Sequence, residues 1–595
     1  MSESEATASP QGRAAISPFS AIAVGIVAAG GALGLSEILS GLSRKIPSLV
    51  VSVAEEIVDI TPGFIARWSI DTLGSAQKPA LVWGIVIVSI LLGAVLGWPS
   101  RKRWWVMPAG LVVFAVVGGW AAARNPLSSD GLGWMSGLVS GAFGIAVFLS
   151  LYVLARAAIP SGESDEPAEE QRVPMVGRGR FNDRRRFVGA VGIMAGASLA
   201  GGLLGRWLRR RDTVEGAREG VAEALQGRTI ATPTALPTPV PTAQAGDDDA
   251  MVDSSPGSTP EATPAAGADP TAEPTAEATG EPTPSVTAEP VREPNFDHIA
   301  GIAPLITPNE DFYLIDTALS YPQVDPADWS LQIHGMVDRE VEISFDELLD
   351  LGLVREQVTL SCVSNSVGGR LVGNAEWVGV PLARVLDEAG VQPGATQIVG
   401  RSIDRWTAGF PTEVALDGRV AMVAVQMNGE PLPISHGFPA RLVVAGLYGY
   451  VSATKWLSDI ELTTWEAFNG YWIPRGWSKE GPIKTQSRID VPRVGSVINP
   501  GPTAIAGVAW APSRAIEKVE VQVDEEPWVE AELSRETTIN SWRQWMVTWN
   551  ATPGRHQVRV RATDGTGTTQ TPEISDPAPD GATGWHTIQV RAEEA

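Results

Sequence analysis

Five long uncharged runs lie in the first third of this 595-residue chain and constrain its fold more than any other feature. Each run reaches about 20 residues, the last one barely, and this is the length that a helix needs to cross a hydrocarbon core. Buried helices of a large soluble protein are the alternative, which the short charged loops between most of the runs disfavour. The sequence therefore predicts an N-terminal α-helical membrane domain over residues 1–210. The five runs are 14–36, 79–100, 104–123, 131–155 and 187–205.

The positive charges around these runs predict an orientation. Arg13 precedes the first run, Arg101 to Arg103 lie between the second and third, and six arginines from Arg172 to Arg186 lie between the fourth and fifth. Loops rich in arginine and lysine face the cytoplasm. We therefore expect a multi-pass protein of the cell membrane with its N-terminus in the cytoplasm and everything after the fifth span outside. The loop 37–78 is long enough for an interfacial helix around Ile46 to Ile60.

The fifth run has an unusual start. Arg184, Arg185 and Arg186 precede a glycine-rich, mildly apolar stretch, and this arrangement resembles a twin-arginine export signal placed inside the chain. An ordinary positive flank of a membrane helix is the equal alternative. The basic residues Arg209 to Arg211 after the run argue against simple charge-driven export, and a route for folded proteins would explain them.

The rest of the chain changes composition twice. Residues 228–292 are mostly Thr, Pro, Ala, Glu and Asp and cannot bury enough apolar surface to fold, so we place a disordered tether at 211–292. A globular α+β domain follows at 293–492, with a helix at 380–390 and a buried strand at 441–446. Alternating valines then indicate an immunoglobulin-like β-sandwich at 493–595.

The net charge of −23 is concentrated after the membrane domain. A nucleic acid partner needs clustered positive charge, so this balance opposes nucleic-acid binding.

Cys362 is the only cysteine of the chain. One thiol excludes an intrachain disulfide, a paired redox motif and an iron–sulfur cluster. All five histidines follow the last apolar run, so no membrane helix offers a usual haem ligand, and neither haem nor an iron–sulfur cluster is expected. A lone cysteine is by default a small buried apolar residue.

The surroundings of Cys362 change this interpretation. Three blocks carry the pattern. The first is Ser361-Cys362-Val363-Ser364-Asn365 with a following Gly373-Asn374-Ala375-Glu376-Trp377, and the second is His436-Gly437-Phe438-Pro439-Ala440-Arg441 followed by Tyr448-Gly449 and Ser452-Ala453-Thr454-Lys455-Trp456. The third is Pro308-Asn309 with Phe312-Tyr313 near the start of the domain. Together they resemble the sulfite oxidase family of molybdopterin enzymes over about 294–592, and the C-terminal part resembles the family's dimerisation domain. The resemblance implies a molybdenum–molybdopterin cofactor whose metal is bound by the Cys362 thiolate, the catalytic ligand.

The resemblance also implies a set of residues around the pterin. A planar guanidinium and a compact ammonium suit its phosphate. The implied cofactor-binding residues are Asn309, Phe312, Tyr313, Ser402, His436, Arg441, Ser452, Thr454 and Lys455.

The chain departs from the family at its substrate arginines. Pro308, Ser366 and Val367 stand where sulfite oxidases carry arginines, which puts sulfite as the substrate in doubt. Three other arginines are candidate substitutes, each of which is more typical of a surface or structural position. They are Arg370, Arg405 and Arg475. The family's active-site tyrosine has no certain counterpart, although Tyr471 and Trp477 lie in that stretch.

Two functions remain open at this point. The first is a membrane-anchored, extracytoplasmic oxidoreductase that transfers an oxygen atom to or from a small molecule and exchanges electrons with a separate carrier, with a homodimer through the C-terminal domain. The second is a membrane-tethered binding or sensory protein that keeps the fold without catalysis. Retention of Cys362, Arg441 and Lys455 favours the enzyme.

Overall fold

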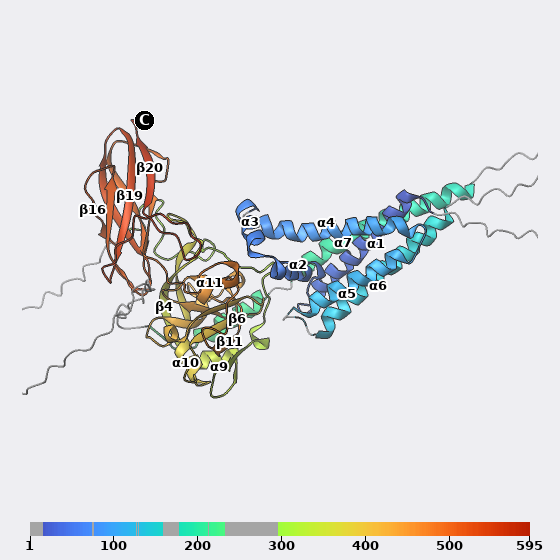
Figure 1. Cartoon of the computed structure of the whole chain (residues 1–595), viewed down its shortest axis with the longest axis horizontal. Helices are drawn as coiled ribbons and strands as arrows, with labels where there is room; N and C mark the ends of the chain where they lie inside the picture. Colours follow the sequence, from blue (N-terminus) through green and yellow to red (C-terminus); the bar gives the residue numbers. More distant parts are fainter. Residues whose placement is uncertain are drawn as a thin grey trace, which may run out of the picture.

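The computed structural model describes residues 16–73, 76–125, 128, 130–158, 178–211, 214–232 and 296–594. Three parts follow one another from the helical bundle through a mixed α+β domain to a β-sandwich at the C-terminus (Figure 1). Most of the predicted tether and Arg172 lie outside the described residues.

The helical part contains five helices that are long and apolar enough to cross a membrane, as the sequence predicts. Helix α1 is central, because it packs against α4, α6 and α7. The five helices are α1 (Pro18–Leu42), α4 (Gln77–Ser100), α5 (Val106–Ala123), α6 (Asp130–Ala157) and α7 (Arg178–Arg211).

Small residues allow α1 and α4 to approach closely. A Cβ atom on Gly25 of α1 would lie 2.1 Å from the carbonyl oxygen of Gly93 and 2.9 Å from the Cα of Gly97, both on α4. Any larger residue at Gly25 would push the helices apart. Contacts of this kind are the usual means of helix association in lipid, where burial of apolar surface contributes little.

Two short helices connect α1 to α4 at the end of the bundle that faces the α+β domain (Figure 1). Helix α2 (Leu49–Ile60) lies where the sequence predicts a helix around Ile46 to Ile60, and helix α3 (Gly63–Leu73) follows it. The side chain of Ser48 caps α2 by accepting a hydrogen bond from the backbone N–H of Val51 at 3.4 Å. Helix α2 carries acidic side chains that reach the neighbouring domain, as described below.

The structure differs from the sequence prediction at the start of the tether, which we placed at residue 211. Helix α8 (Glu215–Gln226) buries Val221 and Leu225 in the core of the α+β domain, and β1 (Ile230–Ala231) pairs in parallel with β4 (Leu353–Ser361). The guanidinium of Arg218 also donates to the carbonyl of Pro431 at 2.9 Å. The charged composition of this stretch hid two apolar residues spaced four apart on one helix face.

The α+β domain is built on two sheets. One has the strand order β1-β4-β5-β8-β10 with β9 beside β8, and the other has the order β3-β2-β11-β6-β7. Their elements are β2 (Ser330–Gly335), β3 (Val341–Ser344), α9 (Phe345–Asp350), β5 (Val372–Pro381), α10 (Leu382–Asp387), β6 (Gln397–Ser402), β7 (Thr407–Pro411), β8 (Ala421–Met427), β9 (Glu430–Pro431), β10 (Arg441–Val444), α11 (Gly449–Ser452) and β11 (Leu457–Thr463).

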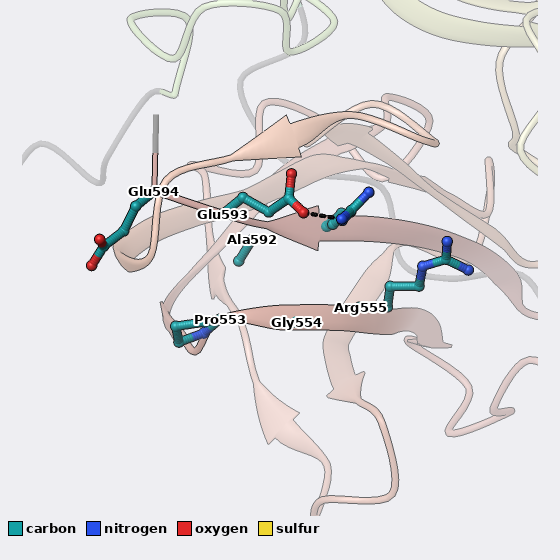
Figure 2. Close-up of a pocket in the computed structure, with 7 residues that line it drawn as sticks. Pro553, Gly554, Arg555, Ala592, Glu593 and Glu594 are labelled. Atoms are coloured by element: carbon teal, nitrogen blue, oxygen red, sulfur yellow. Dashed lines mark ion pairs between the residues drawn. The ribbon is translucent and has the colours of Figure 1, made fainter.

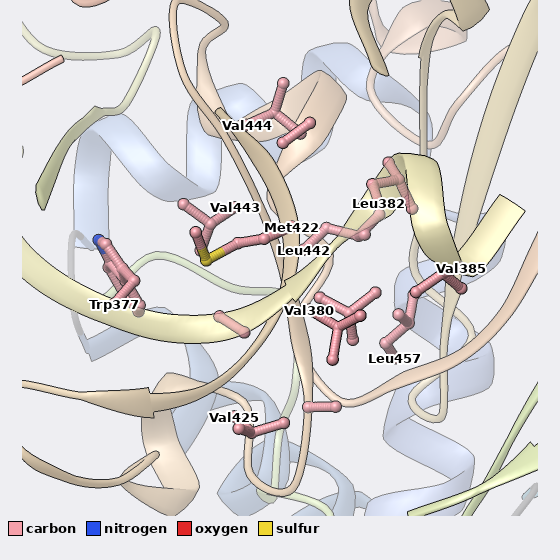
Figure 3. Close-up of a cluster of buried hydrophobic side chains, with 14 of the residues drawn as sticks. Trp377, Val380, Leu382, Val385, Met422, Val425, Leu442, Val443, Val444 and Leu457 are labelled. Carbon is pink, nitrogen blue, oxygen red and sulfur yellow. The ribbon is translucent and has the colours of Figure 1, made fainter. Parts of the chain in front are cut away.

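One apolar core joins the two sheets and helix α10. Leu382 and Val385 of α10 face Leu442 of β10 and Leu457 of β11, and all four side chains are fully buried (Figure 3). The predicted helix at 380–390 and the predicted strand at 441–446 are both observed, the helix at about half the predicted length and the strand two residues shorter. This core fixes the strand ends from which the site residues project.

The C-terminal part is a sandwich of two sheets, with the orders β12-β14-β18-β17 and β13-β20-β19-β15-β16. Val519 and Val521 of β15 pack with Val558 and Val560 of β19, as the alternation predicts. The strands are β12 (Gln486–Val491), β13 (Val497–Ile498), β14 (Gly501–Trp510), β15 (Ile516–Val523), β16 (Val529–Glu530), β17 (Glu532–Leu533), β18 (Arg543–Ala551), β19 (Gly554–Asp564) and β20 (His586–Ala592).

Candidate active site

Cys362 begins the loop that joins β4 to β5. Its backbone N–H donates to the carbonyl of Leu371 at 2.9 Å, and its own carbonyl accepts from the N–H of Asn365 at 3.0 Å. The Asn365 side-chain oxygen accepts from the Leu371 N–H at 2.8 Å and closes the loop. The cysteine side chain is buried, and burial raises the pKa of its thiol. The loop therefore holds one buried thiol in a fixed place.

The C-terminal domain supports this loop from outside. Arg488 of β12 donates to the carbonyl of Gly369 at 2.9 Å, and the ring of His586 lies against Gly368. The Nδ1 atom of His586 accepts from the N–H of Ile489 at 2.9 Å. Burial, with Arg488 nearby, lowers the pKa of His586 to about 4, so the ring is neutral at pH 7.

Three ring side chains, those of Phe312, Tyr313 and His436, pack together in the candidate site. Phe312 stacks on Tyr313 with ring centroids 5.3 Å apart and meets the ring of His436 edge-on at 5.6 Å. His436 Nε2 lies 3.1 Å from the carbonyl oxygen of Asn309, which requires a proton on that nitrogen. Burial and the nearby Arg441 lower the pKa of His436 to about 4. The imidazole is therefore a neutral donor that holds the 309–313 segment in place.

Arg441 is the most unusual charge of the site. It is 5% exposed, stands over the ring of Trp377 at 5.1 Å and donates from Nη1 to the carbonyl of His436 at 3.1 Å. In the described part of the chain no carboxylate forms a salt bridge with it. Burial lowers its pKa to about 10, so it is still charged at pH 7. An uncompensated buried cation favours an anion beside it.

Tyr313 lies within the electrostatic reach of both Cys362 and Arg441. Burial raises the pKa of its phenol, the thiolate form of Cys362 raises it further, and the positive charge of Arg441 lowers it. The phenol is therefore protonated at neutral pH and can act as a hydrogen-bond donor.

Lys455 is compensated, in contrast to Arg441. Its ammonium donates to Asp316 Oδ2 at 2.7 Å and to the carbonyl of Ser435 at 3.0 Å, and it stands over the ring of Trp456 at 4.6 Å. Burial lowers the pKa of Lys455 to about 8, while Asp316 opposes that change. Among the described residues these two acceptors leave one of its three N–H groups for a ligand.

The remaining predicted residues use their side chains within the protein. The hydroxyl of Ser452 donates to Tyr448 at 3.1 Å and that of Thr454 to Gly400 at 3.4 Å. The amide of Asn309 donates to Glu430 at 2.5 Å. These hydroxyls can still accept a hydrogen bond, whereas the neighbouring N–H groups of Ala453 and Trp456 already donate to the carbonyls of Gly449 and Gly437.

Ser402 lines a polar groove of about 500 Å³ together with Arg401 and Asp459, and Cys362 is not among the lining residues. The Ser402 hydroxyl accepts from the N–H of Asp404 at 3.3 Å. The segment after Ser402 is joined to the Lys455 segment, because the N–H of Ile403 donates to the carbonyl of Trp456 at 2.9 Å.

The candidate substitutes for the missing substrate arginines have other partners. Arg405 forms salt bridges with Glu56 at 2.9 Å and Asp59 at 3.3 Å, both on helix α2. Arg475 stands over the ring of Tyr471 at 3.7 Å and donates to that residue's carbonyl at 2.7 Å. Arg370 is exposed at the end of the cysteine loop. Arg405 and Arg475 have structural roles, as the sequence suggests.

Two residues of the site had no role in the sequence interpretation. Asp316 carries no motif, and only the fold brings it to Lys455. Tyr448 belongs to one of the matching blocks, and burial raises its pKa to about 12 with a further contribution from Cys362. In the sequence, the position of Tyr448 directly before Gly449, where α11 begins, could have indicated its place in the site.

A second groove, of about 650 Å³, is unrelated to this chemistry. It lies at the tip of the sandwich between the start of β19 and the end of β20 (Figure 2), where Pro553, Arg555 and Glu594 line it. No predicted site residue is among its lining residues.

Comparisons with known proteins agree with this geometry. The family model of the oxidoreductase molybdopterin binding domain matches residues 318–472. Mitochondrial sulfite oxidase of Mus musculus is 28% identical over 289 residues, which are 41% of this chain and 52% of that protein. The uncharacterized oxidoreductase YuiH of Bacillus subtilis is 32% identical over 157 residues, which are 26% of this chain and 76% of that protein.

Among solved structures, the sulfane dehydrogenase SoxCD from Paracoccus pantotrophus is 21% identical and has a TM-score of 0.42, with 53% of this chain and 96% of that chain covered. The chain spans about half the length of the curated sulfite oxidases that it matches.

The fold and the matches together define the central part of this protein as a molybdopterin-binding oxidoreductase domain, which implies a molybdenum cofactor. The chain belongs to the sulfite oxidase family. Five candidate membrane helices precede that domain.

Proposed function

We propose that this protein is a membrane-anchored oxidoreductase of sulfite oxidase type, in which Cys362 binds the molybdenum of a molybdopterin cofactor. The state of Arg441 carries the proposal: a buried guanidinium without a carboxylate partner among the described residues suits an anion, and the pterin phosphate is one. When bound, the cofactor supplies oxygen-atom transfer and the accompanying two-electron change.

The state of Cys362 supports its role as the metal ligand. Burial raises the pKa of the thiol, whereas hydrogen bonds from Ser364 lower it. No cation of the described residues lowers the pKa of the thiol, so the sulfur keeps its proton at neutral pH, and binding of a metal releases that proton. The closed loop between Cys362 and Leu371 fixes the direction of the sulfur in advance.

The other residues of the site bind and orient. Arg441 and Lys455 are the cations for the phosphate, and the neutral His436 keeps the 309–313 segment against the pterin side of the site. The phenol of Tyr313 holds a proton near the sulfur at neutral pH. The substrate class that we propose is a small molecule that gains or loses one oxygen atom, with a separate protein or small carrier for the electrons.

The proposed sidedness places the catalytic domain outside the cytoplasm. Lys78 at the start of α4 and Glu56 on α2 contact that domain, whereas Arg101, Lys102 and Arg103 follow the other end of α4. The positive loop and the catalytic domain thus belong to opposite ends of one spanning helix. The positive-inside rule then assigns the basic end to the cytoplasm. A homodimer through the C-terminal domain remains part of the proposal.

Export of a domain that already contains a pterin requires a route for folded proteins, so we propose that Arg184, Arg185 and Arg186 act as an internal twin-arginine signal. Replacement of all three by lysine preserves the charge. In that variant the first four spans insert, and the C-terminal domain stays protected from protease added to cells. If the C-terminal domain were as accessible to protease in this variant as in the parent, the three arginines would act only as a topology signal.

The activity itself is tested with the full chain purified in detergent. The parent protein should turn over a small oxide or its reduced partner with an artificial electron donor or acceptor, and Cys362→Ser should abolish turnover, because a hydroxyl replaces a thiolate ligand poorly. Full turnover in the Cys362→Ser variant would disprove the proposed mechanism.

A further inference from the structure

A residue of the membrane domain reaches the wall of the candidate cofactor site. Lys78, in the first turn of helix α4, donates from Nζ to Asp316 Oδ1 at 2.6 Å, and Lys455 donates to Asp316 Oδ2 at 2.7 Å. The carboxylate is thus shared by one lysine from each domain. Lys78 also donates to the carbonyl of Ala318 at 2.9 Å, which fixes the 316–318 backbone to α4.

The shared carboxylate is well protected. The side chain of Asp316 is 5% exposed and that of Lys455 10%, whereas that of Lys78 is 33% exposed. Burial alone would raise the pKa of Asp316, but the two ammonium groups hold it below its ordinary value. Asp316 is therefore charged at every pH at which the protein would work.

Lys78, Asp316 and Lys455 form a triad whose net charge depends on Lys78. Lys455 and Asp316 alone sum to zero, so the pair would offer an anion little attraction. With Lys78 the triad carries one net positive charge, and the share of Asp316 taken by Lys78 leaves more of the Lys455 charge for a ligand. The membrane domain thus contributes to the positive potential of the site.

The same two domains are also joined by a second, separate set of contacts. Glu56 of α2 pairs with Arg405 at 2.9 Å, and Asp59 of α2 pairs with it at 3.3 Å. Glu56 further pairs with Arg124 at the end of α5 at 3.2 Å. These contacts join the domains without touching Lys455, so they provide a matched control for docking alone.

We propose that Lys78 is a positioning residue for the cofactor site, which acts through Asp316 to hold Lys455 and to leave its charge free for the anionic group of the cofactor. This inference rests on the proposed function, because it takes Lys455 as a cofactor-binding residue. The membrane domain is then a structural part of the site in addition to an anchor. A catalytic domain detached from α4 has a weaker hold on its cofactor.

The test compares Lys78→Gln with the conservative Lys78→Arg and with the docking control Glu56→Gln, all as full chains in detergent. The pterin and molybdenum lost over time from purified protein are measured at low salt. Lys78→Gln should lose them about threefold faster, a change that corresponds to about 0.7 kcal/mol for a partly exposed charge. Lys78→Arg and Glu56→Gln should stay close to the parent.

A second readout needs no cofactor. In protein from cells that cannot make the pterin, amide hydrogen exchange of residues 313–318 and 452–456 should be faster in Lys78→Gln than in Glu56→Gln. Equal cofactor loss in Lys78→Gln and parent, or an equal effect of Glu56→Gln, would overturn the inference. A parent protein without any pterin would instead refute the proposed function, and the exchange readout would still decide whether Lys78 orders the Lys455 wall.

Discussion

Replacement of Arg441 by methionine tests whether Arg441 serves to bind an anion or only stabilises the fold. Methionine removes the charge and keeps most of the volume. Burial lowers the pKa of Arg441 from 12.5 to about 10, which corresponds to a cost of about 3 kcal/mol for the charged form. The folded pKa is the lower one, so this cost is fully present at pH 7, below both pKa values.

Two contacts of Arg441 offset that cost in the cofactor-free protein. The hydrogen bond to the carbonyl of His436 at 3.1 Å contributes about 1.5 kcal/mol, and the contact with the ring of Trp377 at 5.1 Å about 1 kcal/mol. The two sides cancel to within about 1 kcal/mol. Arg441→Met should therefore leave the thermal midpoint of the cofactor-free protein within about 3 °C of the parent.

A matched control is Arg514→Met in the C-terminal domain. Arg514 is equally buried, but it forms a salt bridge of 2.9 Å with Asp564, whose side chain is 1% exposed. Its loss leaves a buried carboxylate without that partner and should cost about 3–5 kcal/mol, or about 10 °C. The assay is thermal unfolding of the full chain in detergent, followed by tryptophan fluorescence.

The presence of the cofactor should make Arg441 important, although its loss hardly affects the stability of the cofactor-free protein. In protein expressed with the pterin available, Arg441→Met should contain markedly less of it than the parent, whereas molecules that retain molybdenum keep near-normal activity per metal atom. Two results would refute this reasoning. One is a cofactor-free Arg441→Met protein as destabilised as Arg514→Met, and the other is an undiminished pterin content.

Three further predictions follow from the packing and the titrating groups. Gly368→Ala should lower molybdenum content, because φ is +74° and the new Cβ would collide with the His586 ring. Gly418→Ala, with φ +90° and open space around it, should cost only about 1 kcal/mol by chemical denaturation. The pKa of His436 is about 4 in the fold against 6.5 in the unfolded chain, so its contribution to the free energy of unfolding is lost as pH falls from about 6.5 to 4. Between pH 7 and pH 5, the free energy of unfolding of His436→Gln should therefore fall by about 2 kcal/mol less than that of the parent in urea titrations. Leu225→Ala should destabilise the α+β domain by about 2–4 kcal/mol, and no change would mean that α8 does not pack on it in solution.

Much of the fold follows from local pattern. Helix α10 and strand β15 were predictable because their apolar residues recur at the spacing of one buried face, as Leu382, Val385, Val519 and Val521 show. The apolar runs likewise predict the five long helices, because length and lack of charge suffice for a membrane span. These features depend on neighbours in sequence.

The features that were not predicted depend on distant pairs. Lys78 and Asp316 are 238 residues apart, and Arg405 meets helix α2 across a separation of 349 residues. No periodicity records such contacts. Helix α8 was missed for a related reason, since its apolar face is only two residues deep and gains stability only from the domain core.

The candidate site was predictable where a motif carries it and not elsewhere. Cys362, His436 and Arg441 lie in matching blocks, and the structure brings them into one region. Asp316 lies outside every block, and its importance depends on which side chains the fold places beside it. Residue types in a motif predict the candidate cofactor-binding residues. The charges that balance these residues can be found only from the three-dimensional structure.

The most direct test of the central claim is metal and pterin analysis of the full chain purified in detergent after native expression. We expect about one molybdenum and one pterin per parent chain. The Cys362→Ser variant should keep much of its pterin but show altered sulfur coordination by X-ray absorption at the molybdenum edge. A parent protein with neither molybdenum nor pterin, or a metal environment unchanged by Cys362→Ser, would contradict the central claim.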